Sequence, residues 1–258
     1  MAPHPTRDHP SPDHWLLVSD VDDTLIGDAA ALDELIALLE RSERLTLTVN
    51  SSRPHASVMA TMETLPRGFR PCAVITALGT EVFVDGELLT AWQDRFAGFD
   101  RGPIDAAMTG LGLTPHAEEM QTPFKASFAV PESMDLERVH AALAELDVPH
   151  RTIVSHNDVD FDVIPEAAGK GAATRYLAER LGVPIEQVVV AGDSANDVLM
   201  FEAVEKAIAV GNARDELRRV ADPDKTFFAA RPCSGGIIEG LRHYAAPLAA
   251  DRPAQAGR

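Results

Sequence analysis

Lysine, cysteine and aromatic residues are all scarce in this chain of 258 residues. Lysine occurs only at positions 125, 170, 206 and 225, so each lysine is a rarer choice than usual. The two cysteines, Cys72 and Cys233, lie far apart, and no Cys/His cluster has the spacing of a zinc site. Aromatic residues make up 5% of the chain, and the hydrophobic 45% comes mainly from Ala, Leu and Val, which suits an α/β protein. No apolar run approaches the length of a membrane span.

Acidic residues outnumber basic residues, with 40 Asp and Glu against 23 Lys and Arg. The formal net charge is −17 and the pI about 4.8. Such a surface repels phosphate backbones and anionic lipid headgroups, so we expect neither nucleic acid nor a membrane as a partner. A phosphorylated substrate would be repelled as well, so any site for one must carry its own local positive charge.

The ends of the chain show no targeting signal. The first residues, MAPHPTRDHPSPDH, are rich in Pro and His and lack the apolar segment of a signal peptide. We expect residues 1–13 to form a disordered leader and residues 246–258 a disordered tail. The protein is expected to be cytoplasmic, as a monomer or a small homo-oligomer.

An acidic turn follows the first apolar run, in LLVSDVDDTLIGD at residues 16–28. Asp20, Asp22 and Asp23 place three carboxylates within four residues, at the end of a strand that is expected to be buried. Carboxylates this close repel one another, and burying them is costly unless a positive charge lies among them. The stretch is therefore either an exposed acidic turn or part of a cation site.

A second acidic turn, GDSAND at residues 192–197, ends another apolar strand. The carboxyl ends of parallel strands share one edge of a sheet, so Asp20, Asp22, Asp193 and Asp197 can converge although about 170 residues separate the two turns. Clustered oxygen ligands without His or Cys select Mg²⁺, which would relieve the repulsion between the carboxylates. Taken alone, each turn also fits an ordinary loop or helix cap. The combination of the two favours the metal site.

The wider pattern predicts an α/β fold, a Rossmann-like parallel-sheet hydrolase core with an inserted α+β cap domain. We expect a cap at residues 88–163 and a catalytic core made of residues 14–87 and 164–245. A hairpin with Asp85-Gly86 at its turn would end the first half of the core. Further expected elements are strands at 15–18, 45–49 and 72–76, helices at 29–40, 101–111 and 135–146, a helix that Ser52 could cap, and a half-exposed strand at 124–130.

Lys170 and Ser51 are the other two core candidates. Lys170 opens the helix predicted from GKGAATRYLAERLG, where a positive charge is mildly unfavourable unless an anion lies nearby. Ser51 ends the second strand in NSSRP and could instead be a plain cap or turn residue. Their joint occurrence with the two acidic turns indicates one site, since each of the four segments falls at the end of a strand or the start of a helix.

These four segments resemble the motifs of the haloacid-dehalogenase-like phosphohydrolase superfamily. The matching residues are Asp20-Val-Asp22-Asp-Thr24, Ser51, Lys170 and Gly192-Asp193-Ser-Ala-Asn196-Asp197, and the similarity spans nearly all of residues 15–245. The segments ITALGTEVF, FKASFAV, FDVIPEAAGKGAA and VVVAGDSANDVLMF are similar to the sucrose-phosphate phosphatase subgroup, which includes mannosylfructose-phosphate phosphatase. Ser52 departs from the pattern, because these proteins usually carry Gly there, and we expect a small change in turn geometry.

The resemblance implies a phosphatase that works through an aspartyl-phosphate. Asp20 would be the nucleophile. Asp22 would be the general acid, which protonates the leaving sugar oxygen and then deprotonates the incoming water. Lys170, Ser51 and backbone N–H groups would hold the phosphoryl oxygens.

For the cofactor, the resemblance implies Mg²⁺. The Asp20 carboxylate, the Asp22 backbone carbonyl and Asp193 would be its ligands. Asp197 and Asn196 would help through water. The cation would bridge the nucleophile and a phosphoryl oxygen and shield their repulsion.

Contacts to the rest of the substrate must come from other residues, and the inserted cap is the expected lid. Lys125 in FKASF resembles a family position that faces the sugar, although it could also be an exposed strand lysine. Ser52 and Glu81 are further candidates for substrate binding. Weaker candidates at the expected domain junction are Gln121, Ser155, His156 and Asn157.

The favoured function is a Mg²⁺-dependent phosphatase that acts on a small phosphorylated disaccharide or glycoside, such as sucrose 6-phosphate or mannosylfructose phosphate. A sugar phosphomutase or phosphotransferase could use the same residues. A non-catalytic partner of a glycosyltransferase is the alternative from another class, and the intact set of Asp20, Asp22, Lys170 and Asp193 argues against it. An active enzyme could still associate with the synthase that makes its substrate.

Overall fold

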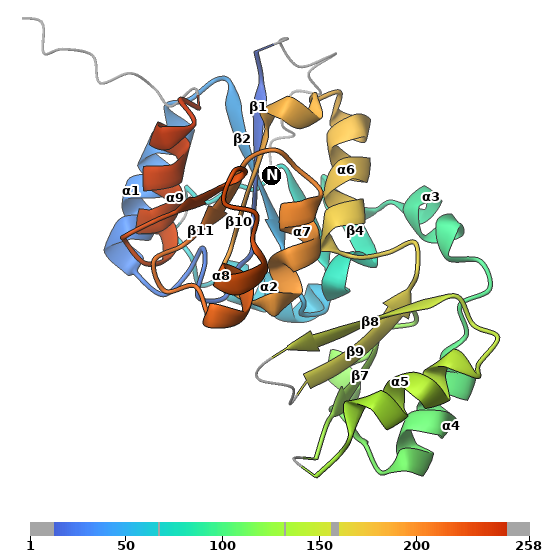
Figure 1. Ribbon diagram of the computed structural model, residues 1–258. Coiled ribbons are helices and arrows are strands. Elements are labelled where there is room, and N and C mark those ends of the chain that lie inside the picture. The colour runs from blue at the N-terminus through green and yellow to red at the C-terminus, as the bar shows by residue number, and fades with distance from the viewer. Residues whose placement is uncertain (1–12, 67, 132, 156–159, 247–258) are drawn as a thin grey trace, which may run out of the picture.

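The computed structural model describes residues 13–66, 68–131, 133–155 and 160–246. Within these residues the chain forms two β-sheets, a larger one of eight strands and a smaller one of four. Figure 1 shows the smaller sheet beside the larger one, with α4 (Arg101–Leu111) and α5 (Leu136–Ala144) packed on its outer side. The leader and tail expected at the two ends lie almost wholly outside the described residues.

The larger sheet has the strand order β12-β11-β10-β1-β2-β3-β4-β5. Its first six strands are parallel, and β4 and β5 add an antiparallel hairpin at one end. Helices bury both faces at the centre, which is why the central strands read as continuous apolar runs. The strands are β1 (Trp15–Ser19), β2 (Leu45–Asn50), β3 (Ala73–Thr76), β4 (Glu81–Val84), β5 (Glu87–Leu88), β10 (Val188–Gly192), β11 (Ala207–Ala209) and β12 (Thr226–Phe228).

Helices cover both faces of the larger sheet (Figure 1). The helix α1 (Ala29–Glu40) packs beside α9 (Cys233–His243) on one face, and α6 (Lys170–Leu181) packs beside α7 (Val198–Glu202) on the other. The expected helix at 29–40 is confirmed, and the Asp28 side chain caps it by accepting a hydrogen bond from the Ala31 N–H at 3.0 Å. The remaining helices are α2 (His55–Met62), α3 (Thr90–Gln93) and α8 (Asp215–Val220). None of the helices in the described ranges is long and apolar enough to cross a membrane.

The smaller sheet is antiparallel throughout, in the order β6-β7-β9-β8. One face packs on α4 and α5 through an apolar cluster that includes Phe128, Phe161 and Met108. The strand expected within 124–130 is present at Ala126–Ala129, but the expectation that it is half-exposed is wrong, because the polar Ser127 is buried as well, on the face turned toward the larger sheet. The strands are β6 (Thr114–Pro115), β7 (Ala126–Ala129), β8 (His150–Ser155) and β9 (Asp160–Pro165).

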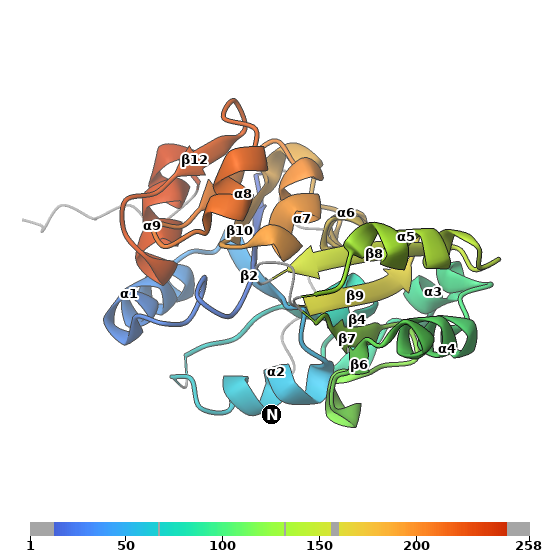
Figure 2. The same ribbon diagram turned by 60° about the horizontal axis from the view of Figure 1, so that its bottom comes forward.

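We propose that the smaller sheet, with α4 and α5, is the inserted cap. The boundaries at residues 88 and 163 stay a prediction. An apolar cluster around Trp92 of α3 joins the two parts, since it contains Ile75 and Leu177 of the core and Ile164 of β9. Figure 2 shows the smaller sheet lying against the same end of the larger sheet as α7.

Two local expectations have different outcomes. The hairpin at Asp85-Gly86 is confirmed, since both residues adopt the positive φ that a two-residue turn of this kind requires, 52° and 81°. The Ser52 cap of α2 is wrong, because the helix begins at His55 with Pro54 as its N-cap residue. Arg53 precedes this proline, and the residue before a proline is disfavoured in the helical region, so the helix cannot start earlier.

Gly171 is expected to be irreplaceable at the contact between α6 and α7. A Cβ atom at this position would lie 2.0 Å from the backbone oxygen of Leu199. We expect Gly171→Ala to lower the free energy of unfolding by about 1–3 kcal/mol, because the two helices must move apart. Gly110 in α4 is the control, since nothing lies within 4 Å of a Cβ there and Gly110→Ala should be neutral or stabilising. Denaturant unfolding measures both variants. Equal changes in the free energy of unfolding for Gly171→Ala and Gly110→Ala would contradict this account of the contact.

Candidate active site

The site begins where β1 and β10 end. The two strands are parallel neighbours with Ser19 opposite Ala191, so Asp20, one residue beyond Ser19, and Asp193, two residues beyond Ala191, emerge at one edge. The Asp20 N–H donates to the Ala191 carbonyl at 2.9 Å, which fixes the start of the first acidic turn. The predicted convergence of the two turns is therefore present in the structure.

Lys170 lies buried at the centre of this edge. Its Nζ donates hydrogen bonds to Oδ1 of Asp20 at 2.7 Å, Oδ1 of Asp197 at 2.7 Å and Oδ1 of Asn196 at 2.9 Å. Burial alone would lower the pKa of Lys170, but the Asp197 and Asp20 carboxylates raise it above its ordinary value. The lysine is therefore held as a cation at the floor of the site.

The carboxylates around Lys170 carry more negative charge than one lysine balances. Burial raises the pKa of the Asp20 carboxyl, with Lys170 opposing the rise and Asp197 adding to it. Burial and the Asp197 carboxylate raise the pKa of Asp193 to about 6. Single oxygens of Asp20, Asp193 and Asp197 all lie within 4.8 Å of one another. This all-oxygen set, crowded and short of positive charge, fits a hard divalent cation such as Mg²⁺.

Asp197 is engaged on both oxygens. While Oδ1 accepts from Lys170, Oδ2 accepts from the N–H groups of Asp193 at 3.0 Å and Ser194 at 3.3 Å. With Ser194 it forms a capping box, so the helix-cap interpretation of this turn and the functional one are both present. Asp197 is fully buried and does not line the cavity described below. It holds Lys170 and the Asp193 turn together, whereas Asp193 itself faces the cavity.

Asp22 lies further out, and about half of its side-chain surface is exposed. Nε of Arg53 lies 2.8 Å from Asp22 Oδ2, and the same guanidinium donates to the Thr61 hydroxyl of α2 at 2.9 Å. Arg53 was not among the sequence candidates, although it directly follows the Ser51-Ser52 pair. Ser51 is buried and its Oγ accepts from the Arg53 N–H at 3.1 Å, while Ser52 and Arg53 line the cavity.

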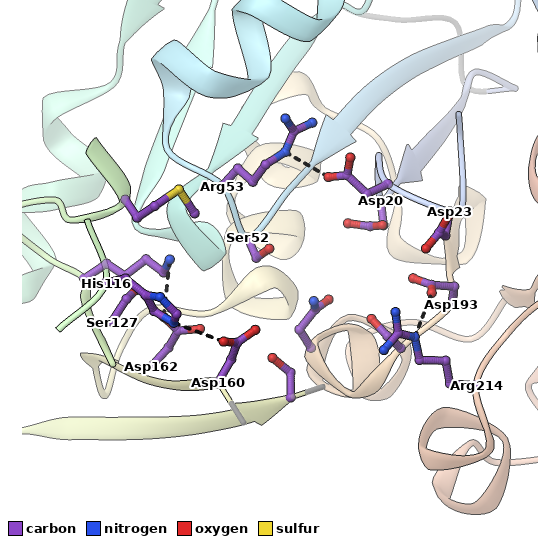
Figure 3. A pocket seen from close by; sticks show the side chains of 16 residues that line it. Asp20, Asp23, Ser52, Arg53, His116, Ser127, Asp160, Asp162, Asp193 and Arg214 are labelled. Carbon is purple, nitrogen blue, oxygen red and sulfur yellow. Dashed lines mark hydrogen bonds and ion pairs between the residues drawn. The ribbon is translucent and has the colours of Figure 1, made fainter. Parts of the chain in front are cut away.

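A cavity of about 250 Å³ opens between the two sheets (Figure 3). In that view Asp20, Asp193 and Arg214 lie across it from Ser127, Asp160 and Asp162 of the smaller sheet. Among the described residues that line it, Met120 is the only apolar one, and none is Phe, Tyr or Trp. The cavity therefore suits a ligand rich in hydroxyl groups. Its lining from the smaller sheet and adjoining loops consists of His116, Met120, Lys125, Ser127, Ser155, Asp160 and Asp162.

The other substrate candidates fall in different places. Lys125 and Ser155 line the cavity, and Lys125 is buried, not an exposed strand lysine. Glu81 does not line it, and accepts a hydrogen bond from the Thr76 hydroxyl at 2.6 Å. The Gln121 side chain bonds the backbone of Ser127 and so supports β7. The two remaining candidates, His156 and Asn157, lie outside the described residues.

Comparison with known proteins identifies the family of the chain. The sequence model of the family described as sucrose-6F-phosphate phosphohydrolase matches residues 13–245. The chain belongs to this family. It is 34% identical to the mannosylfructose-phosphate phosphatase of Agrobacterium fabrum, over 89% of this chain and 96% of the relative. It is 27% identical to a probable sucrose-phosphatase of Arabidopsis thaliana over 91% of this chain, but spans only 60% of that relative.

The fold of the family is shared by solved structures. The sucrose-phosphatase of Synechocystis sp. PCC6803, solved in complex with sucrose and phosphate, aligns with a TM-score of 0.83 at 28% identity, covering 90% of this chain and 98% of that one. A sugar phosphatase of the haloacid-dehalogenase subclass IIB aligns with a TM-score of 0.68 at 15% identity, covering 90% of this chain and 99% of that one, which supports the fold alone. The expected haloacid-dehalogenase-like fold and subgroup are thus confirmed. Its named relatives make the chain a phosphoric monoester hydrolase, and the homology supports a sugar-phosphate phosphatase.

Lys170→Met should destabilise the fold strongly, because it leaves the buried Asp20 and Asp197 carboxylates without their cation. In metal-free buffer at neutral pH we expect the free energy of unfolding to fall by about 3–5 kcal/mol. Lys225→Met is the control, since Lys225 pairs with Glu205 at 3.0 Å on the surface and should contribute less than about 1 kcal/mol. Denaturant unfolding measures both values. Similar small losses would show that the cluster does not depend on the ammonium group.

Proposed function

We propose that this protein is a Mg²⁺-dependent phosphatase that hydrolyses a phosphorylated disaccharide or glycoside through an aspartyl-phosphate on Asp20. The observation that carries the proposal is Asp20, which lines the cavity and is paired with the buried Lys170, while the opposite wall of the cavity is polar and comes from the proposed cap. A carboxylate beside a fixed ammonium group is suited to attack a phosphoryl group, because the ammonium can bind the phosphoryl oxygens.

The reaction would take two displacements. In the first, an oxygen of Asp20 attacks phosphorus, the bond to the sugar oxygen breaks, and Asp22 gives that oxygen a proton. In the second, Asp22 takes a proton from water, the water oxygen attacks phosphorus, and the Asp20 carboxylate is released with inorganic phosphate. Arg53 would orient Asp22 at the rim through the contact at 2.8 Å. Lys170 would hold the phosphoryl oxygens in both steps.

The metal ion would be held by Asp20 and Asp193, with the Asp22 backbone carbonyl as a third ligand. Asp197 and Asn196 would support it, since both also fix Lys170. A bound Mg²⁺ supplies charge neutralisation between the nucleophile and the phosphoryl oxygens. The donor chemistry described above supports this assignment.

The substrate class rests on the relatives and on the cavity. The Agrobacterium and plant relatives are named for phosphates of mannosylfructose and sucrose, which are neutral disaccharides. A cavity lined almost wholly by polar side chains suits such a hydroxyl-rich leaving group. The particular sugar, the oligomeric state, the cytoplasmic location and association with a synthase remain predictions.

Mg²⁺ should stabilise the folded protein through the carboxylate cluster. At 100-fold excess over its dissociation constant we expect about 2.7 kcal/mol of stabilisation, seen as a rise in Tm. Asp193→Asn should remove most of this rise. Asp23→Asn is the matched control, because Asp23 lines the cavity outside the carboxylate trio and Asn tolerates its φ of 58°. An equal rise in Tm for wild type and Asp193→Asn would contradict the metal assignment.

Phosphate release from a panel of sugar phosphates tests the reaction. Asp20→Asn should abolish release from every member. Asp22→Asn should slow release from a sugar phosphate on the order of 10²–10⁴-fold and affect an activated aryl phosphate less, because only the sugar oxygen needs a proton to leave.

Other outcomes of the panel would point elsewhere. Slow release from every sugar phosphate would keep the chemistry and reject the disaccharide class. Transfer of the phosphoryl group to another hydroxyl without release would favour a phosphomutase. No release from any phosphate, the aryl phosphate included, would contradict the proposal and favour a binding role beside a glycosyltransferase.

A further inference from the structure

One face of the cap sheet presents a compact set of charged side chains to the cavity. Ser127 on β7 is paired in register with Asp162 on β9. Lys125 and Asp160 each lie two residues before one of these, and alternate residues of a strand share a face. All four line the cavity. Figure 3 shows Ser127, Asp160 and Asp162 across it from Asp20.

Lys125 and Asp162 form a nearly buried ion pair within this wall. Lys125 is 3% exposed and Asp162 is 7% exposed, and Nζ lies 3.3 Å from Oδ1. The Ser127 hydroxyl donates to the same oxygen. Among the described residues, Oδ2 of Asp162 receives no protein donor and Lys125 has no second acceptor, so the pair retains both accepting and donating capacity for a ligand.

Every basic side chain that lines the described part of the cavity lies beside a carboxylate. Arg53 pairs with Asp22 at 2.8 Å, and Nε of Arg214 lies 3.8 Å from Asp193. Lys125 pairs with Asp162, and the His116 ring lies 3.0 Å from Asp160. None of the described basic side chains that line the cavity is without a carboxylate nearby. A second anionic group would therefore have to bind next to a carboxylate.

We propose that Asp162, by neutralising Lys125, selects phosphate monoesters whose leaving group is uncharged and rejects sugars that carry a carboxylate or a second phosphate. This rests on the proposed function and specifies its substrate. A hydroxyl group both donates and accepts, so neighbouring sugar hydroxyls can bind the pair without separating it. An anionic group that accepts from Lys125 must lie beside the carboxylates of Asp160 and Asp162, which repel it. If it draws Lys125 away, the nearly buried Asp162 keeps only the Ser127 hydroxyl as a donor and loses its counter-charge.

The test compares two ligands that differ in one charge. Glucitol 6-phosphate and 6-phosphogluconate are both open six-carbon chains with one phosphate, and only the second carries a carboxylate in place of the terminal alcohol. Their inhibition constants are measured against the best substrate of the panel, with Mg²⁺ present. Calorimetric titration of both ligands in the Asp20→Asn background gives the same ratio without turnover. The readout is the preference ratio, the constant for 6-phosphogluconate divided by that for glucitol 6-phosphate.

The wild-type protein should give a preference ratio well above one. Asp162→Asn keeps the shape and an acceptor for Ser127 but frees Lys125, so the ratio should fall by on the order of tenfold. Lys125→Met leaves Asp162 unpaired and should raise the ratio. The double variant Lys125→Met/Asp162→Asn removes both charges and should return it toward the wild-type value. Asp105→Asn is the matched control, since it breaks an Arg101–Asp105 pair of the cap outside the cavity.

Two results would overturn the inference. One is an unchanged ratio in the Asp162→Asn variant, provided that thermal unfolding shows that the variant is folded. The other is an equal fall in Asp160→Asn, which would assign the effect to the general charge of the wall and not to the pair with Lys125. Absence of phosphate release from all substrates would instead count against the proposed function, and the calorimetric ratio would still decide the charge selection.

Discussion

The burial of Lys170 among side-chain oxygens is the constraint on which the rest of the structure depends. Its ammonium group can stay charged away from water only because acceptors from the turns after β1 and after β10 reach it. The two strands must therefore be parallel neighbours, and α6 must begin where they end. A shift of one residue in any of these elements would leave a buried charge unpaired, so the cluster fixes three distant segments relative to one another.

The same cluster shows how local structure and chemistry share residues. Gly192 is required here because a Cβ atom would lie 2.5 Å from the Asp197 carboxylate. That carboxylate closes the capping box of the turn with Oδ2 and accepts from Lys170 with Oδ1. The bond that stabilises the turn thus also holds the ammonium beside Asp20. Because Asp197 both caps the helix and accepts from Lys170, the hydrogen bonds of the cap also hold Asp193 and Lys170 in place.

Chain order and strand direction are enough to predict that Asp20, Asp193 and Lys170 meet. The wall of the cap could not be predicted in the same way. The alternation in VDFDVI shows that Asp160 and Asp162 share a face, but not which face turns to the cavity, because that depends on how the smaller sheet packs on the larger one. The position of Glu81 outside the cavity lining could not be predicted for a related reason, since its contact with Thr76 lies across neighbouring strands that no short-range pattern relates to the cavity.

The net negative charge of the chain affects how a phosphorylated ligand can bind at both ends of the cavity. A net charge of −17 repels a phosphorylated ligand at a distance, although salt screens this repulsion beyond about 8 Å. Attraction must therefore act at short range, where Lys170 and a bound cation would supply the positive charge. At the opposite wall a free lysine would compete for the phosphoryl group and invert the orientation of the substrate. Pairing Lys125 with Asp162 removes that competition, so the same pair that would select a neutral sugar would also direct the phosphate toward Asp20.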